Sequence, residues 1–278
     1  MAPEHMSIWQ IIVLALVQGI TEYLPISSSG HLILVPALTG WKEQGVLTDA
    51  ITNVGTVAAT IIYFWRDVVS MFHGLLDIVK RRVTPSSQLV TNVIIATIPV
   101  VLLGLFFHFT KLDEHLRLPI VVALNGIVFG IALYAADSYG LNRNRVADIT
   151  PRTALFFGLA QMLALSPGTS RSGVTITAGR FLGFIRSDAA RFSFLMSIPA
   201  NTAGSTVKLA QAFKDHMPIT SDMIICGILT FFVGLGTITF LMGMIRTQSF
   251  LPFVIYRVIL GGALIGLIYS GMSFGTVN

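Results

Sequence analysis

The sequence contains few charged residues and almost no cysteine. Only 11% of its 278 residues are charged, against roughly 25% in an ordinary soluble domain. Hydrophobic residues make up 54% of the chain and the mean hydropathy is +0.78. The single cysteine, Cys226, excludes an intrachain disulfide and a thiolate metal cluster, and we expect it to be a small buried hydrophobe. The shortage of charge predicts an integral membrane protein.

Two further features are missing. The first residues, "MAPEHMSIWQ", lack a basic segment and a small-residue cleavage site, so we expect no cleaved signal peptide. The apolar runs are continuous and do not alternate with polar residues, which excludes a transmembrane β-barrel. An all-α membrane fold is therefore expected.

The apolar runs predict six full transmembrane helices and two re-entrant helix–loop–helix hairpins. The six full spans, each near the length of roughly 20 residues that a membrane helix needs, are 48–65, 89–110, 119–137, 192–213, 219–245 and 250–272. Two other segments, 7–39 and 152–185, are interrupted at Pro25 and at "SPGTSRSG" (166–173). Their apolar flanks are too short to cross alone, which favours hairpins that enter and leave on one side.

The two interrupted segments resemble each other. "LVQGITEYLPISSSG" (16–30) aligns without gaps to "LAQMLALSPGTSRSG" (159–173), and three spans follow each of them. Because three is odd, the second half must enter the membrane inverted. The sequence predicts one membrane domain, 1–278, with repeat halves of about 1–137 and 151–278 and a linker at 138–150. In folds of this kind the broken helices meet near the bilayer midplane, so we expect the two loops to face each other.

Lys and Arg residues orient this topology. One side collects eleven of them and the other five, which makes the first side cytoplasmic and puts both termini outside. The remaining two, Arg171 and Arg257, lie in segments at membrane depth. The net charge of +5 is then mostly a positive-inside signal and does not indicate nucleic-acid binding. Segment 68–82 is too short to span, and we expect a cytoplasmic helix extension or an interfacial helix.

The first loop carries polar groups that are costly at membrane depth. Gln18 and Glu22 are four residues apart and share a helical face. An ionisable group at this depth indicates a functional site, although a structural pair with Arg171 is the alternative. His31, beside a carboxylate and hydroxyls, is a candidate for proton transfer. The serines could also serve only to satisfy the backbone that Pro25 frees.

The second loop indicates the class of ligand. Arg171 sits among serine, threonine and glycine, and its guanidinium suits a phosphate or carboxylate. A nearby carboxylate favours a divalent cation, Mg²⁺ or Ca²⁺, between Glu22 and phosphate oxygens.

"QGITEYLPISSSGH" and "PGTSRSGVT" resemble the two signatures of the bacitracin-resistance type undecaprenyl-diphosphate phosphatases. "FSFLMSIP" (192–199) and "FLPFVIYR" (250–257) are also similar to segments of that family, so the resemblance covers essentially the whole chain. It implies a multi-pass enzyme of the bacterial cytoplasmic membrane that hydrolyses undecaprenyl diphosphate to undecaprenyl phosphate and inorganic phosphate. It also implies dependence on a divalent cation, a role in peptidoglycan synthesis, and bacitracin resistance.

The resemblance assigns roles to residues of both loops. The catalytic candidates are Ser28, His31, Glu22 and Arg171, and the cation candidates are Glu22 and Gln18. The substrate-binding candidates are Ser27, Ser29, Gly30, Ser170, Ser172, Gly173 and Thr175. The first acidic position of the family motif is glutamine here, which puts in doubt any mechanism that needs two carboxylates.

The expected reaction is phosphoryl transfer to Ser28, with His31 assisting proton transfer and Arg171 stabilising the phosphate oxygens. Attack by His31 or by a positioned water remains open. The expected partners are a polyprenyl diphosphate and membrane lipids, and a homodimer is left open. The rival is an inverted-repeat transporter or flippase of a phosphate-bearing lipid or anion, which the repeat alone would favour.

Overall fold

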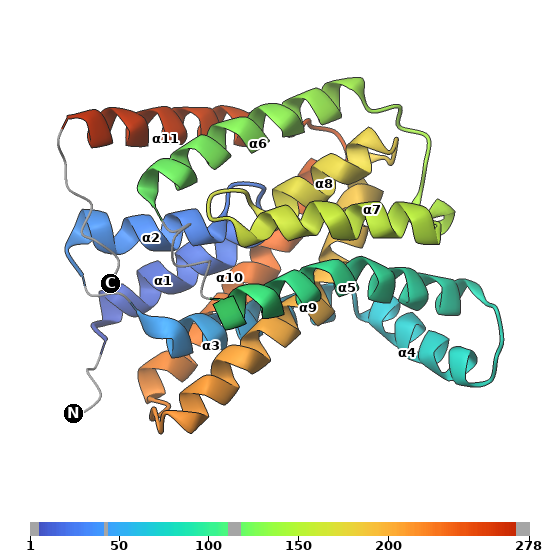
Figure 1. Cartoon of the computed structure of the whole chain (residues 1–278), viewed down its shortest axis with the longest axis horizontal. Helices are drawn as coiled ribbons and strands as arrows, with labels where there is room; N and C mark the ends of the chain where they lie inside the picture. Colours follow the sequence, from blue (N-terminus) through green and yellow to red (C-terminus); the bar gives the residue numbers. More distant parts are fainter. Residues whose placement is uncertain (1–5, 42–43, 111–117, 271–278) are drawn as a thin grey trace.

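The computed structural model describes residues 6–41, 44–110 and 118–270, and every regular element in these ranges is helical (Figure 1). The first half contains α1 (Ile8–Thr21), α2 (Ser28–Thr39), α3 (Gly45–Tyr63), α4 (Trp65–Val79), α5 (Pro85–Thr110) and α6 (Pro119–Tyr139). The second contains the short helix η2 (Val146–Asp148), α7 (Pro151–Met162), the short helix η3 (Leu163–Leu165), α8 (Arg171–Phe181), α9 (Arg186–Lys214), α10 (Ser221–Met244) and α11 (Leu251–Tyr269). The all-α prediction is confirmed.

Five helices, α3, α5, α6, α10 and α11, are long and apolar enough to cross a membrane. They correspond to five of the six predicted spans. The sixth, 192–213, lies within α9, which has 29 residues and a more polar composition. Ser193, Ser197 and Ser205 of α9 are buried. The polarity of α9 follows from its position, because it packs on α3, α5 and α8 inside the molecule.

Both interrupted segments are broken where the sequence predicts. Helices α1 and α2 have 14 and 12 residues, and α7 and α8 have 12 and 11. At about 1.5 Å per residue none of the four spans a hydrocarbon core of about 30 Å. Thr150 caps α7 by accepting the Thr153 N–H, and Pro151 occupies the first turn, where proline is favoured.

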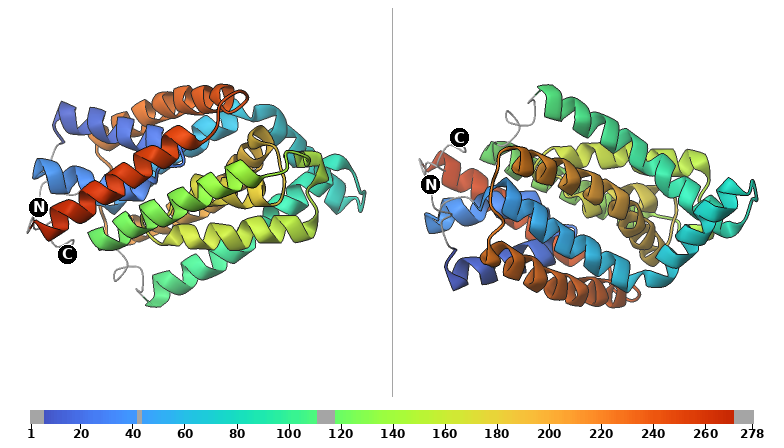
Figure 2. Two further views of the ribbon diagram at one scale, coloured as in Figure 1. Left: turned by 90° about the horizontal axis from the view of Figure 1, so that it is seen from above. Right: turned by 90° about the horizontal axis from the view of Figure 1, so that it is seen from below.

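The helices pack in pairs that join the two halves. Helix α3 packs on α10, α6 on α11, α1 on α10, and α5 on α7. Figures 1 and 2 show the start of α1 and the end of α11 at one end of the molecule, and α4 with the α6–α7 connection at the other. The loops that follow α1 and α7 lie in the interior between these pairs.

Helix α4 covers most of the segment for which the sequence predicts a helix extension or an interfacial helix. It begins directly after α3, at a break in which Phe64 has φ −99° and ψ 30°, and it packs on α5. Its other side exposes apolar residues, among them Val69 and Phe72. It is thus a separate amphipathic helix.

Candidate active site

The two interrupted loops meet in the centre of the molecule. Ser172 Oγ, at the start of α8, donates to the carbonyl oxygen of Leu24 in the first loop at 3.2 Å. Each loop ends in a serine that caps the next helix: Ser27 Oγ accepts the Gly30 N–H at 3.4 Å, and Ser170 Oγ accepts the Gly173 N–H at 3.1 Å. The predicted meeting of the loops is therefore observed.

The two loops also share a second feature, a contact between the hydroxyl of the capping serine and that of the serine two residues later. Ser27 Oγ lies 3.3 Å from Ser29 Oγ, and Ser170 Oγ lies 3.3 Å from Ser172 Oγ. In each loop the two hydroxyls thus contact each other, and the capping serine also serves the backbone of the next helix.

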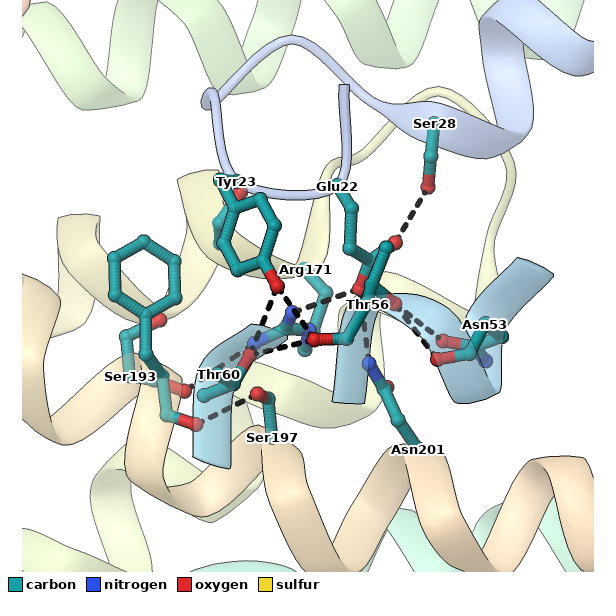
Figure 3. A network of polar contacts seen from close by, with 12 residues as sticks. Glu22, Tyr23, Ser28, Asn53, Thr56, Thr60, Arg171, Ser193, Ser197 and Asn201 are labelled. Atoms are coloured by element: carbon teal, nitrogen blue, oxygen red, sulfur yellow. Dashed lines mark hydrogen bonds and ion pairs between the residues drawn. The ribbon is translucent and has the colours of Figure 1, made fainter. Parts of the chain in front are cut away.

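Glu22, directly after α1, is the centre of a polar network (Figure 3). Its Oε1 accepts hydrogen bonds from Arg171 Nη2 at 2.8 Å and Asn201 Nδ2 at 2.9 Å. Its Oε2 accepts from Ser28 Oγ at 3.1 Å and Gln18 Nε2 at 3.2 Å. Glu22 and Arg171 are 11% and 13% exposed. One carboxylate therefore joins both loops and α9.

The Arg171 guanidinium has hydrogen-bond partners at both terminal nitrogens but none among the described residues at Nε. Its Nη1 donates to the carbonyl oxygen of Ser193 at 3.2 Å. Its Nε is buried and has no hydrogen-bond partner among the described residues. Thr175 Oγ1 donates to the Arg171 carbonyl oxygen at 2.8 Å and lies 2.6 Å from Ser193 Oγ. Because a buried N–H without a partner is costly, Arg171 has a donor to offer an anionic ligand.

His31 lies on a different side of the first loop. Its Nδ1 is 2.7 Å from the Ser27 carbonyl oxygen, and its Nε2 is 2.6 Å from Tyr256 Oη on α11. A carbonyl oxygen only accepts, so Nδ1 carries the proton, and in the neutral ring Nε2 accepts from Tyr256. The structure brings Ser28, Gln18 and Arg171 to Glu22, but it engages both nitrogens of His31 elsewhere.

Arg257, which the sequence marked only by its depth, is 2% exposed and binds both loops. Its Nη1 donates to the Pro25 carbonyl oxygen at 3.1 Å, and its Nη2 donates to those of Gly168 and Thr169 at 3.1 and 2.9 Å. It also donates to the carbonyl oxygens of Asn125 and Gly126 on α6. All of these acceptors are backbone atoms, so Arg257 fixes where the loops lie.

Sequence reasoning missed several contributors to the site. Asn201 contacts Glu22, and Tyr23 Oη donates to the Thr56 carbonyl oxygen at 2.5 Å and lies 3.0 Å from Thr60 Oγ1. One signal was available for α3: its buried threonines recur every fourth residue, at Thr48, Thr52, Thr56 and Thr60. Nothing in the sequence marks Asn201.

A divalent cation in this site would have few protein ligands. Among the described residues, no group of three His, Cys, Asp or Glu side chains could hold a metal ion. Glu22 supplies one carboxylate, and Gln18, whose Nε2 contacts it, has an amide oxygen to add. This donor set fits a hard cation that takes its other ligands from water and phosphate, as Mg²⁺ commonly does.

Fold and site together define a multi-pass membrane protein whose central carboxylate, hydroxyl and guanidinium come from two meeting loops. The chain belongs to the family described as bacitracin resistance protein BacA, whose model matches residues 11–263. It is 45% identical over 267 residues to an undecaprenyl-diphosphatase of Ruegeria pomeroyi, with 95% of this chain and 100% of the relative covered. Proteins of the same name from Jannaschia sp. and Pelobacter propionicus are 45% and 42% identical, over 95% and 96% of this chain and 100% of each relative.

Proposed function

We propose that this chain hydrolyses undecaprenyl diphosphate to undecaprenyl phosphate and inorganic phosphate, the reaction that the names of its relatives describe. The observation that carries the proposal is the contact of one carboxylate, Glu22, with a hydroxyl of its own loop and a guanidinium of the other. A nucleophile, a base and an anion-binding group are what phosphoryl transfer needs. The relatives' names support this reading over a transporter.

Ser28 is the proposed nucleophile and Glu22 its base. Glu22 takes the proton of Ser28 Oγ as that oxygen attacks the terminal phosphorus, and the bond from phosphorus to the bridging oxygen breaks. Undecaprenyl phosphate leaves, and water then hydrolyses the phosphoserine to inorganic phosphate. The 3.1 Å bond from Ser28 to Glu22 supports this pairing. For His31 we propose a role in orienting the loop, which its hydrogen bonds to Ser27 and Tyr256 support.

Arg171 is proposed to bind the diphosphate. Its free Nε and its Nη2, which is shared with Glu22, offer two donors to phosphate oxygens. The start of α8 adds backbone N–H groups at Arg171 and Ser172, which favour an anion. Ser27, Ser29, Gly30, Ser170, Ser172, Gly173 and Thr175 are proposed to shape this pocket.

Glu22 and the Gln18 amide oxygen are the residues that we propose would hold a divalent cation, Mg²⁺ or Ca²⁺, together with the diphosphate. When bound, the cation would neutralise phosphate charge. Because one carboxylate is its only anionic protein ligand here, its affinity should depend on the substrate.

The proposed architecture is an inverted repeat with two re-entrant hairpins. The helix contacts support it, because equivalent helices make equivalent contacts with the other half. Helix α1 of the first half packs on α10 of the second, and α7 of the second half packs on α5 of the first. The last helices of the two halves, α6 and α11, pack on each other. With α9 as a sixth full span, both termini lie outside and α4 lies at the cytoplasmic face of the bacterial inner membrane. The exposed apolar residues of the spans, such as Leu102, Val128 and Ile131, would contact membrane lipids.

Trapping of the phosphoenzyme tests the proposed nucleophile. Acid quenching during turnover of substrate labelled in its terminal phosphate should leave acid-stable label on the peptide containing Ser28, and none in Ser28→Ala. A parallel quench with denaturant at neutral pH preserves phosphohistidine, and acid-labile label at His31 in that sample would replace Ser28 as the nucleophile. If the enzyme turns over and neither Ser28 nor His31 is labelled, water attacks the phosphorus directly.

A further inference from the structure

A cavity of about 520 Å³ opens between α5 and α9. Its walls are apolar: Val101 and Leu105 line it from α5, and Ala203 and Val207 line it from α9. His108, three residues after Leu105, and Lys208, directly after Val207, also line the cavity, at its end nearer the helix C-termini. A volume of about 300–1,000 Å³ with mostly apolar walls is typical of a small-molecule site.

The cavity adjoins the proposed catalytic centre. Ala200 lines it, and the next residue, Asn201, donates to Glu22 Oε1 at 2.9 Å. Leu165 lines it from η3, directly before the second loop. A ligand whose polar head reaches Glu22 could therefore place an attached apolar chain between α5 and α9.

We propose that this cavity binds the isoprenoid units next to the diphosphate of the substrate. The inference rests on the proposed function and adds a tail-binding site to it. The apolar walls match a hydrocarbon chain, and the volume admits only the first part of an undecaprenyl chain, so the rest stays in lipid. The site would select substrates by the presence of a tail.

Two glycines on opposite walls give the means of testing this. A Cβ atom at Gly104 of α5 or at Gly204 of α9 would have no neighbour within 4 Å. Gly262 of α11 is equally open, and it does not line the cavity. A methyl group added at Gly104 or Gly204 would therefore displace no protein atom, and we expect larger side chains at these positions to occupy the cavity. Replacing glycine by alanine also removes the helix penalty of glycine, about 1 kcal/mol.

The experiment compares a size series, Ala, Leu and Trp, at Gly204 with the same series at Gly262, in purified full-length protein. The kcat and KM are measured with undecaprenyl diphosphate and with dimethylallyl diphosphate, which carries one isoprenoid unit. We expect Gly204→Leu to lower the ratio of kcat/KM for the long substrate over the short one by about tenfold, mainly through KM, and Gly204→Trp to lower it further. The Gly262 series should leave the ratio unchanged.

Binding gives a second readout that needs no turnover. Undecaprenyl phosphate should raise the thermal unfolding temperature of the wild type and of Gly262→Trp, and raise that of Gly204→Trp much less. If the wild type is active and the ratio of kcat/KM for the long over the short substrate is the same in the Gly204 series as in the Gly262 series, the tail site is overturned and the proposed function stays intact. A wild type that hydrolyses no polyprenyl diphosphate, yet is stabilised by undecaprenyl phosphate, would overturn the proposed function instead.

Discussion

Ser27 and Ser170 adopt the same uncommon backbone conformation at equivalent places in the two loops. Their φ and ψ angles are 76° and 102° for Ser27 and 71° and 109° for Ser170. A residue other than glycine at positive φ costs of order 1–3 kcal/mol and persists where its surroundings enforce it. Each serine offsets part of that cost by capping the next helix.

Substitutions at Ser170 separate the cap from the strain. Ser170→Ala keeps the strained backbone and loses the hydroxyl, so the free energy of unfolding should fall by about 1–2 kcal/mol. Ser170→Gly loses the same hydroxyl but relieves the strain, so its loss should be only a few tenths of a kcal/mol. Thermal unfolding in detergent measures both. Equal losses would show that the backbone conformation carries no strain.

Ser28 and Glu22 should act as one unit in catalysis. Ser28→Ala and Glu22→Gln should each lower kcat by at least about 100-fold, because each removes one partner of a single proton transfer. The double variant should be no slower than the worse single variant. Steady-state phosphate release measures all three. Multiplicative losses in the double variant would contradict the pairing, and an unchanged unfolding temperature is the control for folding.

Arg257 should position the loops through its bonds to their carbonyl oxygens. Arg257→Lys keeps a charge but replaces the planar fork with one ammonium group, so several buried carbonyl oxygens would lose their partner. We expect kcat to fall at least about tenfold with a smaller change in KM, and Arg257→Met to be worse.

Chemical rescue separates positioning from stability. Added guanidinium should restore part of the kcat of Arg257→Ala, whereas the unfolding temperature should change little. A kcat that simply follows the unfolding temperature in all Arg257 variants would show a structural role alone.

Gln18 should set the affinity for the divalent cation. Gln18→Leu removes an oxygen ligand, so the Mg²⁺ concentration for half-maximal activity should rise several-fold, while Gln18→Glu adds a carboxylate and should lower it. Titration of the EDTA-treated enzyme with Mg²⁺ gives these values. Three identical titration curves would remove Gln18 from the cation site.

The sequence predicted the fold class, both helix breaks and the contact between the loops, because these follow from apolar length, Pro25 and an internal similarity. The sequence also predicted a span at 192–213, but α9, which contains this segment, is not among the five helices that are long and apolar enough to cross a membrane. Its composition is more polar because protein encloses it. The partners of individual side chains were harder to predict from the sequence. Glu22 and Arg171 stood out as charges at depth, whereas Asn201 is an uncharged residue whose role depends on how α9 packs.

His31 also shows that a position in the sequence does not determine which side chains a residue contacts. Its position beside a carboxylate and hydroxyls in the sequence suggested proton transfer near Glu22, and that role stays a prediction. The turn of α2 instead directs it to Tyr256, which is distant in the sequence. Sequence spacing indicates which residues share an element, and packing decides which neighbour each one meets.

The most direct measurement is phosphate release from undecaprenyl diphosphate by purified protein in detergent, with and without EDTA. Wild type should release phosphate only with the divalent cation, and Glu22→Gln, Ser28→Ala and Arg171→Ala, all still folded, should lose that activity, because the site needs both loops. No release by well-folded wild type with added Mg²⁺ or Ca²⁺ would contradict the account.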